Sequence, residues 1–77
     1  MISARQIRAA RALLGWSQQD LGDRAVLSLN AIKRLESGQS DPRISTVMAV
    51  KNALENGGVE FISEGEKGEG VRLRTPP

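Results

Sequence analysis

The chain has 77 residues, of which 39% are hydrophobic and 26% are charged, a composition typical of a single small soluble domain. It contains no histidine and no cysteine, so the usual zinc ligands, the commonest general base and disulfides are missing, and we expect no cofactor and no enzymatic activity. The net charge of +2 is unevenly spread: residues 1–54 carry eight Lys or Arg against four acids, and residues 55–77 carry three against five. A polyanion would therefore meet the first part of the chain, although charge alone is also consistent with a solvated surface.

The first predicted helix begins at Ser3 and ends at Gly15. Ser3 is a good N-cap, and Gln6 three residues later completes a capping box, in which each side chain accepts a hydrogen bond from the other residue's backbone N–H. Ile2 and Ile7 occupy the positions of a hydrophobic staple. Gly15 suits the left-handed conformation that commonly terminates a helix.

Two further helices are predicted to follow with the same starting pattern. Ser17 and Ser28 are their N-caps, Asp20 is favourable in the first turn of the earlier helix, and Gly38 closes the later one at a position that needs positive φ. Each of these helices also begins with the two apolar residues of a hydrophobic staple, Trp16 with Leu21 and Leu27 with Ile32. Because only about ten residues separate the two caps, the helices cannot lie antiparallel across a full core, and a tight crossing at the turn is expected.

A fourth helix is predicted from Ile44 to Asn56, after a polar turn at residues 39–42. Gly57 and Gly58 end it. Its apolar residues define the face that we expect to be buried: Ile44, Val47, Met48, Val50 and Leu54.

The rest of the chain changes to near-alternation at residues 59–62 and 71–74, on either side of a segment rich in Gly and Glu, which predicts a loose β-hairpin. A two-stranded hairpin is marginal in water and needs a further surface. Phe61 and Val71 can supply it by packing on the helices, or a strand edge can pair with the same edge of a second copy. We favour edge pairing, because the strands present unpaired backbone groups and a module this small needs a dimer contact.

Residues 17–25 and 27–38 resemble the helix-turn-helix of the lambdoid repressor and Cro family. The resemblance consists of a polar cap followed by Gln, Leu and Ala in one helix, a spaced Ser and Ile in the next, and a Glu-x-Gly element, and it continues through Pro42 and the fourth helix. The fold implied is mainly α: a four-helix, repressor-like DNA-binding domain at residues 1–57, followed by a short C-terminal β-hairpin at residues 58–77 that would serve as a dimerisation element.

The resemblance implies that the helix beginning at Ser28 enters the major groove of double-stranded DNA. On this mapping Leu29, Asn30 and Arg34 face base edges, with Ser28 and Lys33 alongside. Arg34 could donate to O6 and N7 of guanine, Asn30 could pair with N6 and N7 of adenine, and Leu29 could pack on a thymine methyl group. From the residues alone, Asn30 and Arg34 are also explained as solvated residues on a helix surface.

The resemblance further implies phosphate contacts and one structural ion pair. Gln18 matches a glutamine that follows the second-helix cap and reaches the DNA backbone, where the helix N-terminus also favours an anion. Three residues would contact the backbone on the other side: Gln39, Ser40 and Arg43. Arg11 and Glu36 match the basic residue and the glutamate that pair between the first and third helices. The remaining apolar positions are assigned to the core: Leu21, Ala25, Leu27, Ile32, Leu35, Val47 and Leu54.

Two residues depart from the family pattern. Val26 stands where the family usually has glycine in the turn between the two helices, and a β-branched residue adopts positive φ only at a cost, so we expect this turn to take another path. Gly22 stands where alanine is frequent, which permits close approach of the helices but costs about 1 kcal/mol of helix propensity.

The function predicted is a sequence-specific transcriptional regulator, a repressor that binds a palindromic operator as a homodimer. The alternative from another class is an antitoxin-like module whose tail binds a partner protein and whose DNA binding is secondary. A nuclease is disfavoured, because Asp20, Asp23 and Glu36 fall in structural positions. The short apolar runs and the absence of an apolar N-terminal signal favour a cytoplasmic protein that does not enter a membrane.

Overall fold

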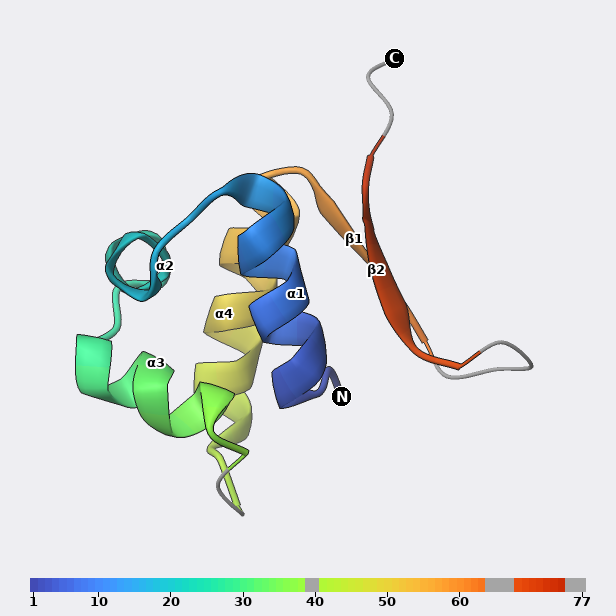
Figure 1. Ribbon diagram of the computed structural model, residues 1–77. Helices are drawn as coiled ribbons and strands as arrows, with labels where there is room; N and C mark the ends of the chain where they lie inside the picture. Colours follow the sequence, from blue (N-terminus) through green and yellow to red (C-terminus); the bar gives the residue numbers. More distant parts are fainter. Residues whose placement is uncertain (39–40, 64–67, 75–77) are drawn as a thin grey trace.

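The computed structural model describes residues 1–38, 41–63 and 68–74. Over these ranges the chain forms, in order, α1 (Ala4–Leu14), α2 (Gln18–Ala25), α3 (Leu29–Glu36), α4 (Ile44–Asn56), β1 (Val59–Ile62) and β2 (Gly70–Leu73). In Figure 1, α1 and α4 run beside each other, α2 and α3 lie on one side of this pair, and the hairpin of β1 and β2 lies on the other. The predicted mainly α fold with a C-terminal hairpin is confirmed.

The predicted serine N-caps are all formed. Each serine Oγ accepts a hydrogen bond from the backbone N–H three residues later: Ser3 from Gln6 at 3.1 Å, Ser17 from Asp20 at 3.0 Å, and Ser28 from Ala31 at 3.1 Å. Gln6 and Asp20 accept in return from the backbone N–H of their caps, so α1 and α2 begin with complete capping boxes. Gly15 and Gly38 adopt the predicted positive φ, at 69° and 78°.

The core lies where the four helices meet and extends onto the first strand. Its buried apolar residues come from all five elements: Ile7, Ala10, Leu21, Ile32, Leu35, Val47, Val50, Ala53, Leu54 and Val59. Ala25 and Leu27, which we also assigned to the core, are half-buried and pack against its edge. Val59 is fully buried, so the first residue of β1 shares one core with the helices.

The predicted buried face of α4 is wrong at two positions. Ile44 and Met48 are exposed by 69% and 47%, although Val47, Val50 and Leu54 are buried as expected. An α-helix turns 100° per residue, which places Ile44 and Met48 on a neighbouring face of α4 from the three buried residues. Only one face of the helix meets the core, so the apolar residues of the second face are left at the surface.

The hairpin packs on the helices of its own chain. The strands are antiparallel, with Phe61 opposite Val71, and both side chains are half-buried against the core. Of the two solutions that we considered for the hairpin, packing on the helical body is found within the chain, and the edge pairing with a second copy that we favoured stays a prediction. The second strand begins at Gly70, one residue earlier than predicted.

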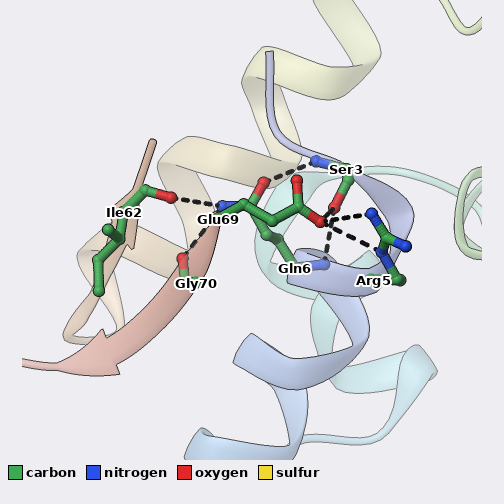
Figure 2. A network of polar contacts seen from close by, with 6 residues as sticks. All are labelled: Ser3, Arg5, Gln6, Ile62, Glu69 and Gly70. Carbon is green, nitrogen blue, oxygen red and sulfur yellow. Dashed lines mark hydrogen bonds and ion pairs between the residues drawn. The ribbon is translucent and has the colours of Figure 1, made fainter. Parts of the chain in front are cut away.

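Gln6 fastens the hairpin to α1, as Figure 2 shows. Its buried side chain donates from Nε2 to the carbonyl oxygens of Ile62 at 3.1 Å and Gly70 at 3.0 Å, one on each strand. Beside it, Glu69 accepts hydrogen bonds from the Ser3 hydroxyl at 2.7 Å and from Arg5 at 3.0 Å. The hydrogen bond from Ser3, together with the nearby Arg5, lowers the pKa of Glu69 from its ordinary value. The start of α1 is thereby tied to both strands.

Candidate nucleic-acid interface

Helix α3 divides into one buried and one exposed face. Ile32, Leu35 and Glu36 are buried, whereas Asn30, Lys33 and Arg34 are exposed on the opposite side. Ser28 is exposed at the N-cap, and Leu29 is half-buried in the first turn. Spacings of three and four residues place side chains on the same side of a helix. Four of the five residues predicted to read bases, Ser28, Asn30, Lys33 and Arg34, are therefore accessible from the N-cap of α3 to one turn further, and Leu29 lies half-buried beside them.

The turn between α2 and α3 sets the angle at which this surface is presented. Contrary to our expectation of another path, Val26 adopts the left-handed conformation, with φ 58° and ψ 49°. The N–H of Leu27 donates to the Gly22 carbonyl oxygen at 2.8 Å, which closes the turn. Glycine is needed at position 22, because a Cβ atom there would come within 2.9 Å of the Leu27 carbonyl oxygen. The backbone after α2 therefore approaches Gly22 closely, in agreement with the close approach that we expected there.

Glu36 joins the first three helices through its side chain. Arg11 donates to it from Nε at 2.7 Å and from Nη2 at 2.9 Å, in a two-point ion pair. The Glu36 side chain is 3% exposed and that of Arg11 is 21% exposed, so solvent screens the pair only weakly. The hydrogen bond to Glu36 raises the pKa of Arg11 above its ordinary value. Both ends of the ion pair expected from the family resemblance are thus in contact.

Gln18 belongs to the same network. It is the first residue of α2, and its Nε2 donates to Glu36 Oε1 at 3.2 Å. An amide nitrogen carries two donors, so this bond leaves one N–H and the side-chain oxygen for a ligand. The Gln18 amide is therefore held in place at the N-terminus of α2, where the helix dipole favours an anion.

A shallow depression separates the end of α3 from the start of α4. Arg34 and Arg43 line it, together with Asp41 and Thr46. Arg43 is the N-cap of α4 but forms no side-chain cap, and its guanidinium has no ion-pair partner among the described residues. The depression thus brings two arginines from different elements to the same side of α3. Gln39 and Ser40, the other predicted phosphate contacts, lie outside the described residues.

A helix-turn-helix family model matches residues 7–60, from the first turn of α1 into β1. The chain belongs to the Cro/C1-type helix-turn-helix family. It is accordingly a DNA-binding transcriptional regulator, and its family is not typically enzymatic. A search of curated proteins finds no match to the chain.

In this helix-turn-helix regulator, the described residues contain no group of three or more His, Cys, Asp or Glu that could hold a metal ion. None of the helices in the described ranges is long and apolar enough to span a membrane.

Sequence reasoning missed the role of Arg8 in the regulator. The Arg8 guanidinium donates to the Glu36 carbonyl oxygen at the end of α3. Arg8 and Arg11, one turn apart, therefore both hold the end of α3. The partners of Arg8 and Arg11 lie 28 and 25 residues away, so no local pattern could indicate them.

Proposed function

We propose that the exposed face of α3 enters the major groove and reads bases through Leu29, Asn30 and Arg34, with Ser28 and Lys33 alongside. The observation that carries this proposal is the placement of these residues on one accessible side of a helix whose other side is buried. In the described part of the chain, neither Lys33 nor Arg34 is committed to an ion pair. Their charges are available to a polyanion, and Arg34 has the planar donor fork that matches guanine.

We further propose that Gln18 and Arg43 contact phosphates on either side of that groove, together with Gln39 and Ser40. Gln18 is supported by its position at the start of α2 and by the anchoring of its amide on Glu36. Arg43 is supported by the depression that it lines with Arg34. Such contacts position a protein on the duplex without reading its sequence.

The proposed mode of action is repression from a palindromic operator, bound by a homodimer in the cytoplasm. One module presents too few base contacts to be selective, and two-fold pairing doubles them over half-sites about 34 Å apart. We propose that residues 58–77 take part in dimerisation. A dimer that covers an operator would exclude other proteins from the same DNA.

The test is selection of bound sequences from a random DNA pool, followed by titration of variants on the selected site. Arg34→Ala should weaken specific binding by about 1–3 kcal/mol and flatten the preference at one base position. Gln18→Ala should weaken binding to all sequences alike. Arg5→Ala, which removes the same charge from the exposed start of α1, is the matched control and should preserve base preference.

Two results would contradict the groove assignment. One is an Arg34→Ala variant whose affinity and base preference both equal those of the original chain. The other is an Arg5→Ala variant that loses base preference as Arg34→Ala does, because Arg5 lies on a different helix from the proposed reading surface.

A further inference from the structure

Helix α4 carries an exposed apolar stripe that the core does not use. Ile44 and Met48, exposed by 69% and 47%, lie one turn apart. At 100° per residue, Lys51 and Glu55 fall on the same side of α4, within 60° of each other and of the two apolar residues. The stripe therefore runs along α4 from its N-terminus to its last turn, apolar in its first half and charged in its second.

The stripe continues onto two other segments of the chain. Lys51 and Glu55 line a groove together with the apolar Met1, Ile2, Phe61 and Ile62 and the polar Gln6, Ser63 and Glu69. Met1 is 85% exposed and Ile62 is 38% exposed. Four exposed apolar side chains from the N-terminus, α4 and β1 thus adjoin Lys51 and Glu55, while Glu69 in the same groove is bonded to Ser3 and Arg5. We call this surface, defined by Met1, Ile44, Met48, Lys51, Glu55 and Ile62, the α4 face.

The charges of the α4 face are complementary to those of the same face on a second copy of the chain. Neither Lys51 nor Glu55 forms an ion pair within the part of the chain that the structure describes. In a two-fold contact the same patch is present on both chains. If one residue of the first chain contacts a second residue of the other, the reverse contact forms as well. Lys51 of one copy can then face Glu55 of the other, and the pair occurs twice, while the apolar residues cover one another.

Edge pairing of β2 brings like charges together in two of its registers. Two β2 strands paired around Arg72 would place the two Arg72 side chains directly opposite, and a pairing around Leu73 would place Arg72 opposite Arg74. Like charges directly opposite each other destabilise a sheet. The hairpin also packs already against the helices of its own chain.

We infer that the α4 face is where a second copy of this chain docks, through the apolar side chains and reciprocal Lys51–Glu55 pairs. The inference deepens the homodimer of the proposed function and rests on it. A stable interface buries about 800 Å² per partner, roughly a sixth of this chain's surface of 5198 Å². The interface must therefore include the N-terminal segment and Ile62 of the hairpin as well as α4.

The first test is sedimentation velocity of the full chain without DNA. The original chain should be a dimer, and Met48→Glu and Ile44→Glu should each weaken self-association by about tenfold or more, because each buries a charge in an apolar contact. Leu13→Glu is the matched control: Leu13 is an exposed leucine of α1, 41% accessible, outside the α4 face, and its substitution should leave the dimer intact. Circular dichroism of each variant checks that it is folded.

The second test places only acids at positions 51 and 55 of one variant and only bases at the same positions of another. Lys51→Glu gives a chain with two acids at the contact, and Glu55→Lys gives a chain with two bases, so each alone should be monomeric. Mixed in equal amounts, the two should form a heterodimer, because every Lys of one chain then meets a Glu of the other. A mixture that stays monomeric, or two variants that each dimerise alone, would overturn the reciprocal pairing.

These outcomes are distinguishable from failure of the DNA-binding proposal. If Met48→Glu stays dimeric, the α4 face is the wrong surface, whereas the base preference read through Arg34 is unaffected. If Met48→Glu is monomeric and binds a single half-site with the original base preference, both the face and the reading helix are supported. A monomeric original chain would overturn the inference while leaving the groove assignment to the Arg34→Ala test.

Discussion

At the scale of single residues, Val26 is the position where local preference and tertiary structure disagree most. It adopts φ 58° with its side chain 88% exposed, so it gains almost no burial in return for the strained backbone. The left-handed region costs a residue with a Cβ atom roughly 1–2 kcal/mol, and a β-branched side chain is among the least suited to it. The turn nevertheless holds this conformation, because the bond from Leu27 to Gly22 and the packing of α3 require it.

Val26→Gly should therefore stabilise the protein. The gain expected is about 0.5–1 kcal/mol, since glycine relieves the strain but loses more conformational entropy on folding. Urea unfolding measures it, with Val26→Ala as the control that removes the branch and keeps a Cβ atom. If Val26→Gly were no more stable than Val26→Ala, the strain would not reside at this residue.

At the scale of elements, one buried polar side chain of α1, that of Gln6, contacts both strands of the hairpin. Gln6 is 5% exposed and satisfies a carbonyl group on each strand. Replacing Gln6 with leucine keeps the volume but leaves both carbonyl groups without this donor. A buried acceptor that loses its partner costs about 1–3 kcal/mol.

Gln6→Leu should accordingly lower the free energy of unfolding by about 1–3 kcal/mol and speed amide exchange in β1 and β2 more than in α3. Gln19→Leu is the matched control: Gln19 is exposed on α2 and bonds only Asp23, so its loss should change stability by less than about 0.5 kcal/mol. Equal effects of the two substitutions, or uniform exchange changes over the whole chain, would show that Gln6 does not fasten the hairpin.

At the scale of the whole molecule, Glu36 determines how the first three helices are arranged. Its carboxylate accepts hydrogen bonds from Arg11 of α1 and Gln18 of α2, and its carbonyl oxygen accepts one from Arg8. Removing the carboxylate leaves the partly buried Arg11 charge without its partner. It also releases Gln18, which we propose contacts a phosphate.

Glu36→Ala should cost about 2–4 kcal/mol, below the upper end for fully buried pairs because Arg11 keeps some solvent contact. Glu60→Ala breaks the exposed, solvent-screened pair with Arg72 on the hairpin and should destabilise the protein far less than Glu36→Ala. Chemical unfolding of both variants side by side tests the difference. A Glu36→Ala protein as stable as Glu60→Ala would mean that the Arg11–Glu36 pair does not hold the helices together.

Local sequence patterns were enough to predict where the helices begin, where α1, α3 and α4 end, and that the last two segments form a hairpin. Ser3, Ser17 and Ser28 bond backbone groups three residues away, so the pattern that predicts each cap lies within one turn of it. The exposed residues of α3 were likewise predictable, because a buried face at Ile32 and Leu35 dictates the opposite one. The family resemblance supplied the ion pair, whose two residues are 25 positions apart.

Tertiary packing, and no local pattern, sets which apolar residues of α4 stay exposed, what Arg8 binds and where the hairpin rests. Sequence periodicity shows that Ile44 and Met48 are apolar but not which of two adjacent faces meets the core. The acceptors of Gln6 lie 56 and 64 residues away, beyond the reach of any local pattern. Such contacts exist only once the helices have packed, because packing, and not the backbone near each residue, brings the partners together.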